Sequence, residues 1–285
     1  MLVRFLLAAS RLLPRPLLAA AGMTLSVLVF GVLGVRRALV REALARSLPG
    51  RGEDERRRIE RAFHRHLGRA LAELLWGITA PLAALREQIV LDGFEALEEA
   101  AASGRGAIVA TAHFGSWELC AVAAARLGLP LAVVSKRLRV GWLDRSWAGL
   151  RARIGLAELP VKGSTRAILR HLRGGGVLGL VIDQHLPPPG GVAVPFLGRE
   201  AFTTRAPVVL HRRSGAPIFT VYLVREGPWR HRMVVRPFEV GEGEAEVAVL
   251  ERLNATLEAR IEAAPEQWLW LHRRWKQPPE KGSPG

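Results

Sequence analysis

The chain has 285 residues and a formal net charge of +15, from 41 lysines and arginines against 26 aspartates and glutamates. This length is enough for one large domain with a sizeable core. The charge indicates an acidic partner, such as nucleic acid, an anionic membrane or an acidic protein. The single cysteine, Cys120, excludes an internal disulfide and every cysteine-based metal cluster. Because it falls within an apolar helical pattern, we expect Cys120 to be packed rather than nucleophilic.

Residues 16–35 contain no charged side chain, and about 20 apolar residues suffice to span a bilayer. Flanking arginines stand at Arg4, Arg11 and Arg15 before the run and at Arg36, Arg37, Arg41 and Arg46 after it. A cleaved signal peptide fits less well, because arginines interrupt its first half and no clean cleavage site precedes the second group. We therefore expect residues 1–35 to anchor the chain to a membrane. The anchor either crosses the bilayer or lies in its interface, and the charge bias favours the cytoplasmic face for the remainder of the chain.

Residues 36–85 have the pattern of a basic helical region that packs on the main domain. The apolar positions recur at helical spacing and are Ile59, Phe63, Leu67, Leu71 and Leu74. The arginines on the other positions are Arg56, Arg57, Arg58, Arg61 and Arg65. These arginines are expected to face anionic lipid, although an ordinary solvated face gives the same pattern.

Residues 86–277 alternate between strand-like and helix-like segments. Short apolar runs at 89–92, 107–110, 131–134 and 177–182 read as strands, with helical patterns between them. This alternation predicts an α/β fold with a mostly parallel central sheet flanked by helices. Towards the end, segments 222–225 and 233–238 are expected to pair antiparallel, and 247–263 to form an amphipathic helix. Residues 278–285 are expected to be a disordered tail.

A histidine and a glutamate follow the strand at 107–110. His113 comes at its carboxyl end, and Glu118 falls in the first turn of the next helical pattern. Ligands of open α/β sheets bind at this edge. A neutral imidazole can take a proton from an alcohol, and a carboxylate on its other nitrogen fixes the tautomer. We therefore expect His113 to be a general base oriented by Glu118. The alternative is a loop histidine beside a helix-capping glutamate.

The strand at 177–182 ends in Asp183, so this carboxylate is expected beside His113 at the same sheet edge. His185 follows in the loop, where histidines are more often bystanders. Zinc-binding patterns such as H-E-x-x-H are absent from the sequence, and the triple glycine at 174–176 precedes a strand instead of a helix, unlike a P-loop. We expect neither a metal nor a cofactor.

Cations gather after the third expected strand, at Lys136, Arg137 and later Arg151. Such side chains suit phosphate oxygens, although a basic solvent face is the plainer interpretation. The segment PEQWLWLHRRWK at 265–276 interleaves tryptophans with cations. This pattern is typical of an interfacial belt or a phosphate contact, or of a final helix that packs its tryptophans on the core. Base-reading and stacking motifs are absent from the sequence, so we expect no nucleic-acid partner.

Several of these motifs resemble the bacterial lysophospholipid and lipid A late acyltransferase family. HFGSWE at 113–118 is similar to its H-x4-D/E motif, VPFLG at 194–198 to its V-x-F-x-G segment, and 265–276 to its terminal P-x-Q-W-x-W-x-H-x-R-W/F-K signature. Leu143-Asp144 and Arg151 also match. The chain departs at Ser135-Lys136-Arg137, where the family usually has aromatic-Arg-Pro. The resemblance extends from about residue 36 to residue 276.

The resemblance implies a membrane-bound acyltransferase on the cytoplasmic face of the inner membrane. Such an enzyme moves a fatty acyl chain from acyl-carrier protein or acyl-CoA to a hydroxyl of a glycolipid, such as a lipid A precursor, without a covalent intermediate. His113 and Glu118 would then be the base pair. Lys136, Arg137 and Arg151 would bind phosphate, and Asp183 would orient the acceptor hydroxyl or the neighbours of His113. Other acceptors remain open: a phosphatidylinositol mannoside, an ornithine lipid or a lysophospholipid. A non-catalytic membrane-surface protein is the alternative of another class.

Overall fold

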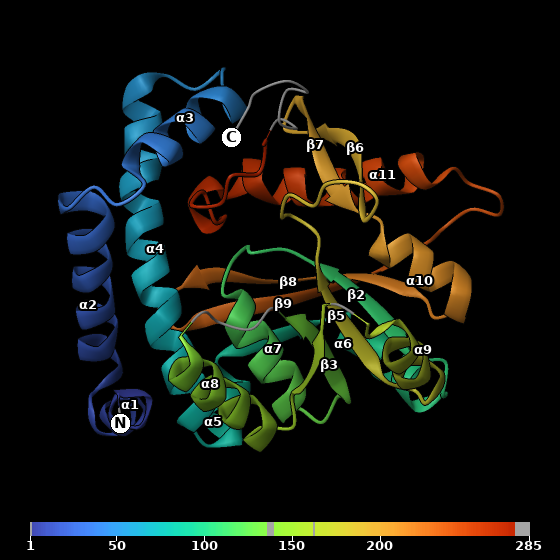
Figure 1. Ribbon diagram of the computed structural model, residues 1–285. Helices are drawn as coiled ribbons and strands as arrows, with labels where there is room; N and C mark the ends of the chain where they lie inside the picture. The colour runs from blue at the N-terminus through green and yellow to red at the C-terminus, as the bar shows by residue number, and fades with distance from the viewer. Residues whose placement is uncertain (1, 136–139, 162, 277–285) are drawn as a thin grey trace.

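The computed structural model describes residues 2–135, 140–161 and 163–276. Its centre is a seven-stranded sheet with helices on both faces (Figure 1). The strands follow the order β1-β9-β8-β2-β5-β3-β4. Their bounds are β1 Ile89–Asp92, β2 Ala107–Thr111, β3 Leu131–Ser135, β4 Ala157–Pro160, β5 Val177–Val181, β8 Ile218–Gly227 and β9 Arg230–Phe238.

The sheet is mostly parallel, which confirms the predicted fold class. β2 pairs in parallel with β5 and β8, and β3 pairs in parallel with β5 and β4. β8 and β9 are antiparallel, as predicted from the last apolar segments, and β1 lies parallel to β9 at the far edge. The central strands are buried on both faces, since every residue of Ala107–Ala110 is buried. β4 was not expected, because this short edge strand has little apolar character.

Helices before, between and after the strands cover the sheet (Figure 1). They are α5 Leu82–Glu87, α6 Phe94–Ala102, α7 Trp117–Arg126, α8 Gly141–Arg153, α9 Thr165–Arg173, α10 Ala206–Ser214 and α11 Glu246–Ala263. The V-x-F-x-G segment forms one arm of a separate hairpin, β6 (Gly191–Phe196) with β7 (Arg199–Thr204). Its inward side chains Val194 and Phe196 are fully buried, so this motif builds core.

A helical layer precedes the sheet and runs along one side of it (Figure 1). It consists of α1 Leu2–Leu12, α2 Arg15–Ser26, a π-helical continuation η1 Val27–Val32, α3 Arg37–Ser47 and α4 Glu53–Thr79. α3 and α4 of this layer lie within residues 36–85, where a basic helical region was predicted. Phe63 is buried on the domain side as expected, whereas Leu71 is 44% exposed. Among the described residues, one helical stretch, Arg15–Val32, is long and apolar enough to cross a membrane.

α2 lies antiparallel alongside α4, and the two backbones approach closely. The contact is made through Gly22 and Gly68: a Cβ atom on Gly68 would lie 2.2 Å from the Gly22 carbonyl oxygen. Leu18 and Ala19 of α2 are buried in a cluster with Ala72 of α4. Nearer the helix ends, the Ser26 hydroxyl donates to the His64 carbonyl at 2.6 Å. The apolar N-terminal segment is therefore folded onto the main domain.

Replacing Gly68 by alanine is expected to destabilise the protein by about 1–3 kcal/mol, the usual range for overpacking. Alanine is the better helix former, so the loss must come from the clash with the Gly22 backbone. Gly149 is a matched control, because it lies within α8 and has open space around it. Thermal unfolding in detergent should show a lower Tm for Gly68→Ala and an unchanged or higher Tm for Gly149→Ala. Equal shifts for both would contradict the close contact.

The chain end does not form the final helix that was one expectation for its tryptophans. After the short 3-10 turn η2 (Pro265–Gln267), the chain runs without regular structure along the core. Trp268 and Trp270 are 1% and 0% exposed, and Arg274 is fully buried against the β6–β7 hairpin. The prediction of an interfacial belt is therefore wrong for Trp268 and Trp270, because both lie inside the protein. Their indole N–H groups are satisfied inside the protein, which makes the burial favourable.

Candidate active site

The central pair of strands brings His113 and Asp183 together. In the β2–β5 register, Thr111 lies opposite Val181, so each of the two residues stands two positions beyond its strand. Both ends lie at the carboxyl edge of the sheet, as the sequence predicted. The His113 backbone N–H donates to Asp183 Oδ2 at 3.1 Å, and His113 Nδ1 lies 2.9 Å from Asp183 Oδ1. One carboxylate thus holds both the main chain and the imidazole of the histidine.

Asp183 is buried and fully engaged. It is 3% exposed, and the Trp268 indole donates a further hydrogen bond to Oδ2 at 2.8 Å. Burial by itself would raise the pKa of this carboxyl. His113, the Trp268 hydrogen bond and the charge of Arg274 outweigh burial and lower the pKa below its usual value. Asp183 is therefore ionised at neutral pH and accepts the Nδ1–H proton.

This tautomer leaves the lone pair of His113 Nε2 as a hydrogen-bond acceptor, and the Gln184 amide N–H donates to it at 3.3 Å. The side chain of His113 is 17% exposed. The Trp117 ring packs edge-on against the imidazole, with ring centroids 5.4 Å apart. Burial would lower the pKa of His113, but Asp183, with a smaller effect from Glu118, reverses this and raises the pKa above its usual value. The ring is thus oriented by a carboxylate on one side and open to a substrate on the other.

The expectation that Glu118 orients the imidazole is corrected by this geometry, since Asp183 occupies that position. Glu118 instead accepts hydrogen bonds from Arg151 at 3.0 and 3.3 Å. The reason is topological: β5 is hydrogen-bonded to β2, whereas Glu118 lies in the first turn of α7 and binds Arg151 of α8. Its contribution to His113 is a charge effect on the pKa.

Arg151 does not present a free charge, because two carboxylates hold it. Besides Glu118, it binds Glu158 of β4, and the Trp147 ring lies 5.2 Å from its guanidinium carbon. The side chain of Arg151 is 12% exposed. Its expected role in phosphate binding stays a prediction. Lys136 and Arg137, which were expected to share that role, lie outside the described residues.

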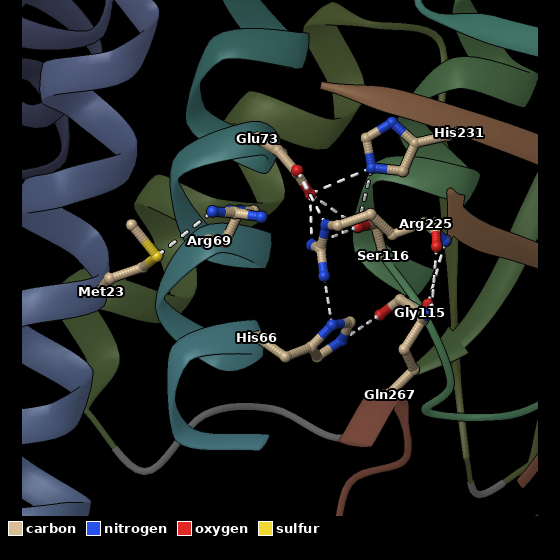
Figure 2. A network of polar contacts seen from close by, with 9 residues as sticks. All are labelled: Met23, His66, Arg69, Glu73, Gly115, Ser116, Arg225, His231 and Gln267. Carbon is tan, nitrogen blue, oxygen red and sulfur yellow. Dashed lines mark hydrogen bonds and ion pairs between the residues drawn. The ribbon is translucent and has the colours of Figure 1, made fainter. Parts of the chain in front are cut away.

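The loop between His113 and α7 rests on a buried polar network (Figure 2). Gly115 has a positive φ of 63°, and a Cβ atom there would lie 2.0 Å from the Leu223 carbonyl oxygen, so only glycine fits. The Ser116 hydroxyl donates to the buried Glu73 carboxylate at 2.8 Å. The members of the network are His66 and Glu73 of α4, Ser116 of the loop, Arg225 of β8 and His231 of β9.

His66 connects this network to the loop backbone. Its Nε2 lies 3.1 Å from the Gly115 carbonyl oxygen, and its Nδ1 contacts the Arg225 guanidinium. Burial and the nearby charge of Arg225 lower the pKa of His66 well below its usual value. The ring is therefore neutral: Nε2–H donates to Gly115, and Nδ1 accepts from Arg225. α4 in this way holds the Gly115–Ser116 loop, and α2 packs on another side of the same helix.

Sequence reasoning did not find several of these residues. Trp268 lies 85 positions from Asp183, and Arg225 lies 159 positions from His66. The terminal motif included Trp268, but its hydrogen bond to Asp183 could not be predicted without the fold. His185 remains outside the site pair; its backbone N–H donates to His272 Nε2 at 3.1 Å. Cys120 is buried, as expected, and burial raises the pKa of its thiol to about 12, which disfavours a nucleophilic role.

The mostly parallel sheet, with the His113–Asp183 pair at the carboxyl edge of its central strands, has the architecture of an α/β enzyme with its candidate site at that edge. The chain belongs to the bacterial lipid A biosynthesis acyltransferase family, whose sequence model matches residues 1–277. It is an acyltransferase. It is 28% identical over 270 residues to the lipid A biosynthesis palmitoleoyltransferase of Escherichia coli strain K12, covering 94% of this chain and 87% of that protein.

Two further relatives show the breadth of the family. The lipid A biosynthesis lauroyltransferase of E. coli strain K12 is 26% identical over 274 residues, which is 94% of this chain and 88% of that protein. The phosphatidylinositol mannoside acyltransferase of Mycolicibacterium smegmatis is 27% identical over 195 residues, which is 67% of this chain and 64% of that protein. These relatives support acyl transfer to glycolipids.

Proposed function

We propose that this enzyme transfers a fatty acyl chain from an acyl thioester to a hydroxyl group of a glycolipid such as a lipid A precursor. The observation that carries the proposal is the His113 imidazole, whose Nδ1 is held by the buried Asp183 while Nε2 faces outward. The donor is an acyl-carrier protein or acyl-CoA. The basic charge of the chain favours either donor and the anionic inner membrane, at whose cytoplasmic face we place the enzyme.

The proposed reaction takes place directly between the two bound substrates, without a covalent acyl-enzyme. Nε2 of His113 accepts the proton of the acceptor hydroxyl while its oxygen attacks the thioester carbonyl carbon. The carbon–sulfur bond then breaks, and the leaving thiolate takes the proton back from His113. Asp183 keeps the tautomer and stabilises the imidazolium. Glu118, fixed by Arg151, adds negative charge that favours the same cation. The buried, protonated Cys120 offers no alternative covalent route.

Lipid A precursors are the first acceptor class, because the relatives that cover most of this chain are named for lipid A. Phosphatidylinositol mannosides are the second, because the mycobacterial relative acts on them by name over 195 aligned residues. Lys136, Arg137 and Arg151 remain the proposed contacts for donor or acceptor phosphate. Arginine and lysine side chains suit the phosphate of either headgroup.

The proposal is tested by acyl transfer in membranes that contain the protein, compared with membranes from cells that lack it. Radiolabelled acyl-carrier protein and acyl-CoA are offered separately with a lipid A precursor, a phosphatidylinositol mannoside or a lysophospholipid. We expect label in a chloroform-soluble product with one of the two glycolipids. Transfer only to the lysophospholipid would overturn the glycolipid acceptor. Equal label in both membrane preparations with every acceptor would overturn acyl transfer itself.

A further inference from the structure

The membrane helix of this enzyme is not separate from the catalytic domain, because it packs along the middle of α4. Arg15 at its start lies over the rings of Trp76 and Trp229, at 5.3 and 5.9 Å. Further along, Gly22 meets Gly68, and at the end Ser26 donates to the His64 carbonyl. The contacts thus step backwards along α4 as they step forwards along α2. α2 and α4 are therefore antiparallel and lie side by side, so that in a membrane both would be at the same depth.

α4 has the catalytic domain on its other side. His66 and Glu73 of this helix hold the Gly115–Ser116 loop next to His113, while Arg69 on the α2 side contacts the Met23 sulfur at 3.5 Å (Figure 2). α4 therefore lies between α2 and the active site. If α2 crossed the bilayer in this arrangement, α4 and part of the catalytic domain would have to enter it as well.

α4 is poorly suited to such a position. Arg61 and Arg65 are exposed, and Arg69 is half-buried, all within the length of α4 that α2 covers or adjoins. Arg65 and Arg69 line an open groove with Met23, Val27 and Leu28. A charged side chain in the hydrocarbon region is expensive unless it faces a partner or water. These arginines instead suit the headgroup region of a membrane surface.

The outer surface of the N-terminal segment is nevertheless apolar. Within the stretch Arg15–Val32, 17% of the residues are buried inside the protein, so most of it faces outward. Its exposed large apolar side chains, with those just before and after it, are Leu12, Leu13, Leu17, Leu25, Leu28, Val32 and Leu33. Exposed arginines flank them at Arg11, Arg15 and Arg36. An apolar face with a cationic border is the pattern of a helix that lies in a membrane interface.

We propose that α1, α2 and η1 form an interfacial face that inserts into one leaflet of an anionic phospholipid bilayer without crossing it. The occupant of this face is the lipid surface: acyl chains against the exposed leucines and valines, and phosphates against the bordering arginines. The inference rests on the proposed membrane location and is independent of the acceptor. It places the residues before α2 and the catalytic domain on the same side of the membrane.

The test is a pair of single-cysteine variants of the full chain, expressed in bacterial cells. Arg11→Cys reports the segment before α2, and Ala255→Cys on the exposed side of α11 reports the catalytic domain. Native Cys120 is buried and stays in place, with the parent protein as the blank. Spheroplasts and inverted membrane vesicles are each treated with a membrane-impermeant maleimide, and labelling is read as a mass shift.

We expect Arg11→Cys and Ala255→Cys to react with the maleimide in the same preparation. In the other preparation both cysteines should be protected. Reaction of the two cysteines from opposite faces of the membrane would show a crossing helix and overturn the proposal, as would recovery of the parent protein in the soluble fraction. Acyl transfer measured on the same membranes separates this from the proposed function. An active enzyme with a crossing helix would overturn the topology alone, and an inactive enzyme with both cysteines on one side would count only against the reaction.

Discussion

Replacing Asp183 by asparagine is expected to slow acyl transfer by about 10³- to 10⁴-fold, since loss of the orienting carboxylate in comparable triads costs about 10⁴. The loss would approach that of His113→Ala, which removes the base. Asparagine keeps the shape of Asp183 and can still accept from Trp268, but its amide cannot both accept the Nδ1 proton and stabilise the imidazolium. Initial rates on a fixed amount of membrane-bound enzyme, with the better donor, measure the effect.

Glu118→Gln is the matched control for this prediction, because Glu118 influences His113 by charge and not by holding its ring. Its rate is expected to fall by less than about 10³-fold, the smallest loss expected for Asp183→Asn, because the carboxylate that holds the imidazole stays in place. A larger loss for Glu118→Gln than for Asp183→Asn would reverse the two roles. In that case Glu118 would be the partner of the base, as the sequence alone predicted.

The pH dependence gives a second check on the same pair. His113 must be neutral to accept a proton, so the rate rises with pH as the imidazole loses its charge. Burial lowers the pKa of His113, whereas Asp183 raises it to a net value above its usual one. In Asp183→Asn the burial remains and the raising charge is gone. The acid limb of the residual activity is therefore expected at lower pH than in the wild type, and a shift to higher pH would contradict the assignment.

Replacing Glu73 by glutamine is expected to reduce the free energy of unfolding by about 3–5 kcal/mol, the usual effect of breaking a buried ion pair. Glu73 has a fully buried side chain and binds the Arg225 guanidinium, the Ser116 hydroxyl and His231 Nε2. The variant leaves a cation with 7% exposure without its counter-charge. Chemical unfolding of the detergent-solubilised protein, followed by tryptophan fluorescence, measures this loss.

Glu53→Gln on the same helix is the control, because its ion pair with Arg57 is exposed and exposed pairs contribute little. No measurable change is expected for it. The pKa of Glu73 is lowered in the folded protein: burial opposes this shift, but His231 and Arg225 outweigh it. The stability that Glu73 carries is therefore present at neutral pH and declines as the pH falls below the usual range of a glutamate. A wild-type stability that did not decline in acid more steeply than that of Glu73→Gln would contradict this account.

The sequence predicted the parts of the site that depend on local pattern. Apolar runs located β2 and β5, and the rule that parallel strands end at one edge placed Asp183 near His113. It did not decide which carboxylate faces Nδ1. Glu118 is five residues from His113 and Asp183 is 70, and the strand-to-helix pattern around His113 favours Glu118. The register of β2 and β5, which no local pattern contains, reverses that preference.

The tryptophans of the terminal motif show a different limit. Indole rings between cations occur both at membrane interfaces and in buried clusters, because in each setting one part of the ring is apolar and the N–H needs a partner. Trp268 finds its partner in Asp183, and Trp270 in the Pro265 carbonyl. Arg274, one of the cations of this segment, is fully buried as well. Composition alone does not separate the two settings, and the fold resolves them.

Because α4 contacts α2 on one side and the catalytic loop on the other, the N-terminal segment is not an interchangeable tether. A soluble enzyme made by truncation before α3 would expose Ala72 and Trp229, which α2 now covers. A chimera with an unrelated lipid anchor would reach the bilayer but lack the same internal support. Preparative work on this enzyme accordingly calls for full-length material and an amphiphile that shields the outer leucines while leaving the helix pair assembled.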